Sequence, residues 1–143
     1  MKPRKLLQLF SFLVAYSGYL TRAGSITAAL NLSDLTLSTA TTYTFTITAM
    51  DNVLIADSHF IFEFDSTLGV TIPNSLSSCV GVLGFTTSSV PCIKESSNRI
   101  RLNCYTCDLS SHPNYEIRIV GIINPAFSLP SSADVNIYTY DQD

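Results

Sequence analysis

Residues 41–50, Thr-Thr-Tyr-Thr-Phe-Thr-Ile-Thr-Ala-Met, alternate apolar side chains with threonine. Tyr43, Phe45 and Ile47 occupy every second position, and the β-branched threonines between them favour an extended backbone. Successive side chains of a strand point to opposite faces, so this pattern predicts a strand with one buried and one exposed face. A helix would scatter the same apolar residues around its circumference. The rest of the chain must therefore supply strands that cover the buried face.

The next clear strand pattern is residues 59–64, which carry three phenylalanines on one face and Ile61 with Glu63 on the other. We expect these phenylalanines to meet Tyr43 and Phe45 across the core, because each aromatic ring buries a large apolar area. Weaker strand patterns cover residues 25–32, 68–72, 79–85, 92–95, 99–104, 115–119 and 135–140. Seven to nine short strands predict an all-β, antiparallel sandwich, with an immunoglobulin-like arrangement as the leading version. Tryptophan is absent, which excludes the Cys-Trp-Cys core of antibody domains.

Residues 1–23 have the pattern of an export signal. A basic start is followed by an apolar run over residues 6–20 and by a small-residue exit, and we expect cleavage after Ala23. A retained membrane anchor is the alternative, but the apolar run is shorter than the roughly 20 residues that a span needs. Residues 24–143 then form a single domain, since their number suits one core rather than two. The expected location is extracellular, either secreted or at the cell surface.

The charge of the expected mature chain excludes some partners. Residues 1–23 contain four of the eight basic residues, which leaves four basic against eleven acidic residues, a net charge of −7. A chain of that sign repels nucleic acid and anionic lipid surfaces. We therefore expect neither nucleic-acid binding nor membrane insertion after the signal is removed.

Four cysteines and one glycosylation sequon fit an exported protein. Cys79, Cys92, Cys104 and Cys107 allow three pairings into two disulfides. Pairing Cys79 with Cys92 and Cys104 with Cys107 closes two local loops and is slightly favoured, while a pairing across the two segments stays open. Asn31 begins the sequon Asn-Leu-Ser and is a candidate glycosylation site. A sugar there would mark an exposed strand edge.

The order of these features resembles a repeated module in secreted surface proteins of ciliates and other protists. The resemblance covers about residues 25–141 and depends on the Thr-rich strand at 42–48, the Phe-rich strand, Val-Gly-Ile-Ile-Asn-Pro at 120–125 and Ile-Tyr-Thr-Tyr-Asp at 137–141. Such modules usually occur in tandem in coats, fibrils and adhesins, and the resemblance implies no enzymatic activity. This chain carries a single copy, which leaves open whether it is a complete subunit or the first module of a longer protein.

Three patterns suggest chemistry, and each has a simpler structural explanation. Cys104-Tyr105-Thr106-Cys107 has the spacing of a redox motif, but strand and turn patterns flank it, whereas a thioredoxin-type site needs its first cysteine at a helix N-terminus. Adding Cys92 and His112 would complete a zinc ligand set, which oxidising export disfavours. Asp108, Ser110 and His112 include the residue types of an acyl-transfer triad. They are crowded into one turn-forming loop with no evident oxyanion donor.

Calcium is the remaining candidate ligand. Asp134, Asp141 and Asp143 could bind calcium between successive modules, although a solvated tail explains them as well. We expect no cofactor, no metal and no catalytic residue in this chain.

The expected function therefore lies in the strand edges. Residues 25–32 and 136–140 contain no charge, and unpaired edges without charge invite strand addition. We expect a non-enzymatic extracellular structural protein that self-associates, or joins neighbouring modules of its kind, into a coat or fibril. The alternative is an adhesive or carbohydrate-binding module in which Tyr105, Tyr138 and Tyr140 stack on sugar rings.

Overall fold

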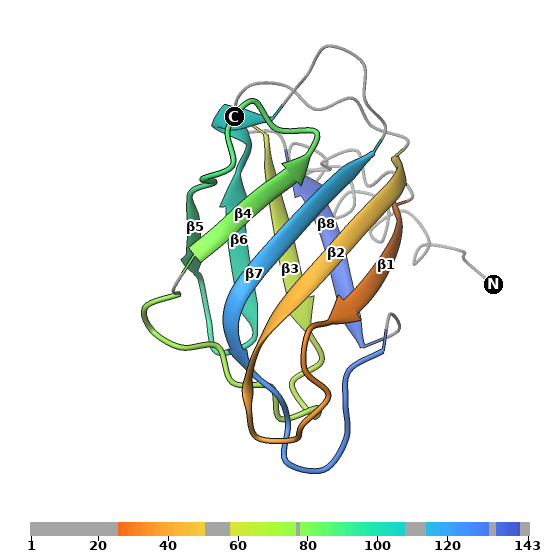
Figure 1. Cartoon of the computed structure of the whole chain (residues 1–143), viewed down its shortest axis with the longest axis vertical. Coiled ribbons are helices and arrows are strands. Elements are labelled where there is room, and N and C mark those ends of the chain that lie inside the picture. The colour runs from red at the N-terminus through yellow and green to blue at the C-terminus, as the bar shows by residue number, and fades with distance from the viewer. Residues whose placement is uncertain (1–25, 51–57, 77, 108–113, 132–133, 141–143) are drawn as a thin grey trace, which may run out of the picture.

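Two four-stranded antiparallel sheets pack face to face in the computed structural model, which describes residues 26–50, 58–76, 78–107, 114–131 and 134–140 (Figure 1). Sheet A has the order β1-β2-β7-β4, and sheet B has the order β5-β6-β3-β8. The strands are β1 (Ile26–Leu32), β2 (Ala40–Met50), β3 (His59–Phe64), β4 (Ser78–Leu83), β5 (Cys92–Lys94), β6 (Arg99–Asn103), β7 (Tyr115–Ile123) and β8 (Val135–Tyr140). A single 3-10 turn, η1 (Cys104–Thr106), follows β6 among the described residues. The predicted all-β antiparallel fold is confirmed.

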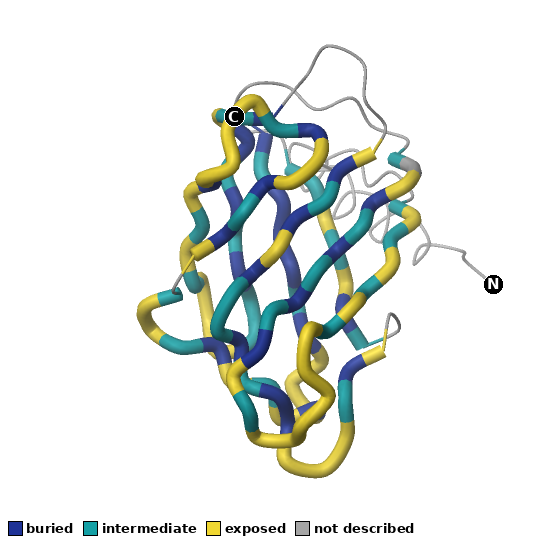
Figure 2. Tube along the Cα trace, viewed as in Figure 1, coloured by how far each residue is buried: buried dark blue, intermediate teal, exposed yellow. Residues whose placement is uncertain are grey.

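The core forms between the inner faces of the two sheets. Tyr43, Phe45 and Ile47 of β2 are each at most 1% exposed, and they face the buried phenylalanines of β3. The rings of Phe45 and Phe62 lie 4.6 Å apart, and those of Tyr43 and Phe64 lie 5.6 Å apart edge to face. The expected contact between the two aromatic strands is therefore confirmed. The buried segments run along the middle of both sheets in Figure 2.

β2 lies inside sheet A because both of its edges are paired. Leu30 of β1 lies opposite Phe45 on one side, and Ile117 of β7 lies opposite the same residue on the other. These neighbours extend the apolar face of β2 across the sheet, as cross-strand pairing requires. The threonines of β2 between the apolar positions face away from the core.

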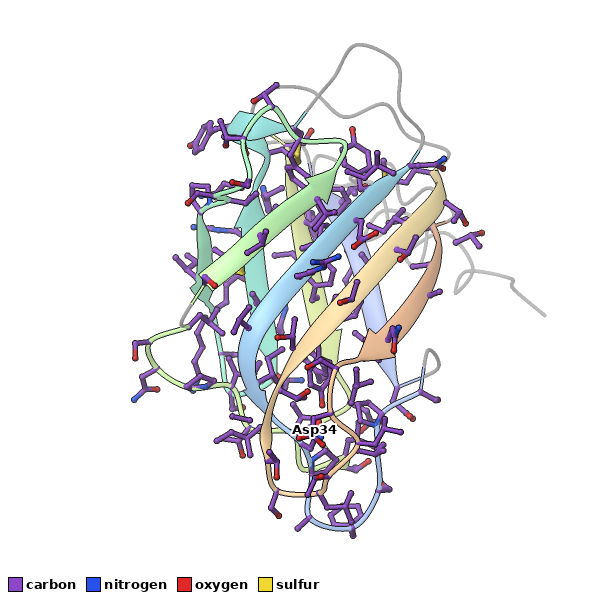
Figure 3. All side chains as sticks on the ribbon, in the orientation of Figure 1. Asp34 is labelled. Atoms are coloured by element: carbon purple, nitrogen blue, oxygen red, sulfur yellow. A yellow bond between two sulfur atoms is a disulfide. The ribbon has the colours of Figure 1, made fainter. Side chains whose placement is uncertain are left out.

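One end of the sandwich is fixed by a buried polar network around Asn124, which precedes Pro125. The Asn124 side chain donates to the backbone carbonyls of Asp34 (3.0 Å) and Thr36 (2.8 Å), and it accepts from the Tyr43 hydroxyl (2.9 Å). Asn124 is 2% exposed, so these bonds satisfy groups that water cannot reach. Figure 3 labels Asp34 at this end of the molecule. The Asn-Pro turn thus holds the 33–39 loop against the core.

One expectation about the strands needs correction. Residues 68–72 form no strand, and within them Thr71 makes a single bridge to Ile123. Val70 and Thr71 precede Pro73, which has no amide proton for a ladder, so pairing stops after one bridge. Ile61 lies on the outer face of sheet B but is 2% exposed, because Arg101 and Tyr138 flank it in register.

Candidate interaction surfaces

β1 and β8 each have one edge that pairs with no other described strand. β1 pairs with β2 alone and β8 pairs with β3 alone, so each ends its sheet. Both lie on the same side of the sandwich, at the right in Figure 1. Neither contains a charged residue. The sequence-based expectation that these two segments are edges is thus met, and the structure adds that they share one side.

The opposite side of the sandwich, formed by β4 and β5, is closed by a covalent link. The Cys79–Cys92 disulfide joins these two strands across the two sheets, with a Cα–Cα distance of 6.1 Å. Lys94 of β5 reaches from the same side, and its ammonium donates to the Ile72 carbonyl (2.7 Å) and to Asn74 (3.1 Å). Residues 88–90 also cover the outer edge of β4, since the Gly81 amide donates to the Ser88 carbonyl (2.9 Å) and the Val90 amide donates to the Cys79 carbonyl (3.1 Å). A covering segment and an edge lysine both oppose the addition of a further strand. The β1 and β8 side can therefore accept an added strand more readily than the β4 and β5 side.

A cavity of about 260 Å³ opens between β1 and β8. It is lined by Ile26, Ala28, Val135, Asn136, Ile137 and Tyr138. The inward-pointing side chains of β1 are only half-buried, in contrast to the fully buried ones of β2. Apolar side chains that belong to the core thus remain partly open to solvent on this side.

The outer face of sheet A carries a larger groove of about 630 Å³. Thr42, Thr44 and Thr46 of β2 line it, together with Glu116 and Arg118 of β7, whose side chains form an ion pair of 2.8 Å. Asn31 of β1, the sequon residue, is exposed at the edge of this groove, in register with Thr44. A glycan on Asn31 would project from this outer face.

The outer face of sheet B brings two of the three candidate tyrosines together. The rings of Tyr138 and Tyr140 lie 6.3 Å apart, and Tyr140 stacks on His59 at 5.5 Å. Tyr105 is 64% exposed in η1, and among the described residues it makes no ring contact with either of them. The expected three-tyrosine surface is therefore reduced to a pair.

Three ion pairs cross the same outer face. Arg99 contacts Glu63 at 3.2 Å and Glu95 at 3.9 Å, and Arg101 contacts Glu95 at 3.4 Å. These side chains are about a quarter to a third exposed, so each pair contributes little to stability on its own. Their charges balance, and the face has no strong electrostatic preference.

The Cys-Tyr-Thr-Cys segment is a disulfide-closed turn. Cys104 and Cys107 are bonded to each other and are 1% and 6% exposed. The amide of Cys107 donates to the Cys104 carbonyl at 3.0 Å, and the Thr106 carbonyl accepts from the amide of Thr86 at 2.7 Å. Cys92 is bonded to Cys79, so the cysteines of the considered zinc set are all used in disulfides. The observed disulfides, Cys79–Cys92 and Cys104–Cys107, are therefore the pairing that closes two local loops, and the pairing across the two segments is wrong.

Several candidate residues lie outside the described residues. These are Asp108, Ser110 and His112 of the considered triad, and Asp141 and Asp143 of the considered calcium site. Asp134 is described, and its carboxylate accepts from the Ser131 amide at 2.6 Å. Within the described ranges, no three metal-ligating side chains come together. The expected signal, residues 1–23, also lies outside them, and no helix in the described part is long and apolar enough to cross a membrane.

Among the described residues, two carboxyl groups in turns and one tyrosine in the core have shifted pKa values. The amide and hydroxyl of Thr36 lower the pKa of Asp34, and those of Thr67 lower the pKa of Asp65. Burial raises the pKa of Tyr43 to about 12. Both carboxylates accept hydrogen bonds from residues two positions on, which is the geometry of an Asx turn. All three groups therefore serve the fold.

The comparisons with known proteins add no relative. The sequence matches no protein-family model and no curated protein, and the fold matches no solved structure.

Proposed function

We propose that this protein is a non-enzymatic extracellular structural protein, a subunit of a coat or fibril that joins its neighbours through strand edges. The observation that carries the proposal is the pair of uncharged edges, β1 and β8, on one side of the sandwich. Each presents a row of backbone amides and carbonyls with no partner among the described strands. Such a row is a template for an added strand, which brings both hydrogen bonds and apolar burial.

The extracellular setting is supported by the cysteines. Two disulfides use all four, and disulfides persist in oxidising compartments such as the extracellular space. The export pattern in residues 1–23 and the sequon at Asn31 agree with that setting. The resemblance to surface modules of protists points the same way.

An immunoglobulin-like arrangement is part of this proposal. The order β1-β2-β7-β4 matches the A-B-E-D sheet of a constant-type domain if β3 and β8 take the places of C and F. The hairpin of β5 and β6 then adds to sheet B beside β3. In the constant-type fold a further strand G pairs with F, whereas the described residues place no strand at that edge of β8.

Charge substitution at the two edges tests the proposal. Thr27→Lys in β1 and Asn136→Lys in β8 alter exposed side chains, so we expect the fold to survive. Electron microscopy and light scattering of the exported protein should show assemblies that the double variant loses. Thr44→Lys, on the outer face of the central strand β2, is the matched control and should leave assembly unchanged. Assembly that persists in the double variant would rule out the edges as the joining surface.

A second candidate function is carbohydrate binding, favoured by the contact between Tyr138 and Tyr140. Tyr138 is 36% exposed, and aromatic faces stack on the apolar faces of sugar rings. A glycan array with Tyr138→Ala as the control separates this function from assembly, because a coat subunit should show no selective glycan binding.

A further inference from the structure

We propose that the joining side of this protein pairs with the same side of a second copy, giving a closed two-fold dimer in which β1 adds to β1 of its partner. The inference rests on the proposed function and names its partner and geometry. It comes from the edges of β1 and β8 that pair with no other described strand. These edges lie together, while the β4 and β5 side is closed by Cys79–Cys92.

The position of the edges argues for closure. A filament built by strand addition needs acceptor and donor edges on opposite sides, so that each added copy presents a new edge. Here both free edges lie on one side, at the right in Figure 1. One two-fold contact uses them both, and edge pairing alone stops at two copies. A larger coat or fibril would then be built from dimers through other surfaces.

The sequence of β1 is suited to pairing with itself. A two-fold axis perpendicular to sheet A at Ala29 sets two copies of β1 antiparallel, with inner faces still inward. Ala28 then lies opposite Leu30 of the partner strand, so a small inner side chain meets a large one. The register shift between β1 and β2 skips Thr48 of β2, which leaves β1 itself regular over its seven residues. The two copies of sheet A would form one continuous eight-stranded sheet.

Charge and exposure also favour a second copy as the occupant. The whole chain has a net charge of −3, so a charged edge of its own sign would repel its copy. β1 and β8 carry no charge and avoid that repulsion. Each copy has one cavity between β1 and β8, and the same two-fold axis places the two cavities face to face. The partner copy then covers Ile26 and Ile137.

Cysteine cross-linking of the exported protein tests the geometry. Ala29 is exposed and would lie next to the axis, so Ala29→Cys should form a disulfide-linked dimer in high yield under mild oxidation. Thr46→Cys is the matched control, because Thr46 lies opposite Ala29 on the next strand and would be several strand spacings from its copy. Val82→Cys reports on the other side, since Val82 is 46% exposed in the edge strand β4.

Sedimentation equilibrium completes the test. At concentrations below those at which coats or fibrils form, the unmodified protein should fit a monomer–dimer equilibrium, and Ala29→Lys should raise the dissociation constant at least tenfold with an unchanged circular dichroism spectrum. Monomers at all concentrations would overturn both this inference and the proposed function. Cross-linking through Val82→Cys, edge-dependent growth beyond the dimer, or a dimer unaffected by Ala29→Lys would overturn the two-fold inference alone and leave the proposed function standing.

Discussion

Replacing Phe45 with alanine tests the core that the alternating strand defines. Phe45 is 1% exposed, and its ring centroid lies 4.6 Å from that of Phe62 and 6.4 Å from that of Phe64. The substitution removes one ring from a stack that joins the two sheets. The cavity it leaves is bounded by strands paired on both edges, which cannot collapse freely.

The size of the effect follows from burial. A buried phenylalanine removes about 150–250 Å² from water, worth about 4–6 kcal/mol at about 25 cal/mol per Å², and compactness of the unfolded chain reduces that figure. Measured Phe→Ala substitutions in cores cost about 3–5 kcal/mol. We therefore expect Phe45→Ala to lower the free energy of unfolding by about 4 kcal/mol, a large share of a total of about 5–15 kcal/mol. For a domain of this size that corresponds to a fall in Tm of about 12–25 °C.

Thermal and urea unfolding, followed by circular dichroism under non-reducing conditions, measure this loss. Phe127→Ala is the matched control, because Phe127 is 68% exposed and should cost no more than about 0.5 kcal/mol. If both variants lost the same small amount, Phe45 would not be a core residue, and the register of β2 against β7 would be wrong.

Three further perturbations probe other parts of the fold. Asn124→Ala should lower the free energy of unfolding by about 2–4 kcal/mol in urea titrations, because it removes the hydrogen-bond partner of two backbone carbonyls and of the Tyr43 hydroxyl. A loss below about 0.5 kcal/mol would show that this network does not stabilise the fold. Replacing Cys79 and Cys92 together by alanine should cost about 3 kcal/mol by calorimetry, the closure entropy of a loop with sequence separation 13, and an unchanged Tm would contradict it. Raising the pH should destabilise the protein between about pH 10 and pH 12, because the folded pKa of Tyr43 lies above its unfolded value and the folded state keeps a proton that the unfolded state releases. Tyr43→Phe should flatten this decline in urea midpoints, and an equal decline in both proteins would assign it to other groups.

Local pattern was enough to predict the eight observed strands and the aromatic core, although it also predicted a strand at residues 68–72 that the structure lacks. The alternation around Phe45 and Phe62 identifies the inward face of each of these strands. It does so without knowledge of the strand order, because the period of two depends on the backbone alone. The segments of β5 and β6 were also predicted as strands, and in the structure they pair as a hairpin beside which Asn98 donates to the Phe64 carbonyl at 2.9 Å.

Long-range arrangement could not be predicted in the same way. The burial of Ile61 depends on Arg101 and Tyr138, which come from strands distant in sequence. The network around Asn124 joins residues that are 81 to 90 positions apart. The position of β1 and β8 on one side depends on the strand order of both sheets, which no local pattern reveals. The lack of charge in both segments indicated only that each is an edge strand.

The positions of the strand ends have a mechanical consequence. Ile26 lies opposite Met50 and Tyr140 lies opposite His59, at the end of the sandwich where β2 ends and β3 begins (Figure 1). A pulling force applied between Ile26 and Tyr140 therefore acts on the β1–β2 and β3–β8 ladders from one end, and it breaks their hydrogen bonds one after another. These strands should peel away at low force, while Cys79–Cys92 holds the far side together. The molecule would yield first at β1 and β8, with β4 and β5 still joined by the disulfide.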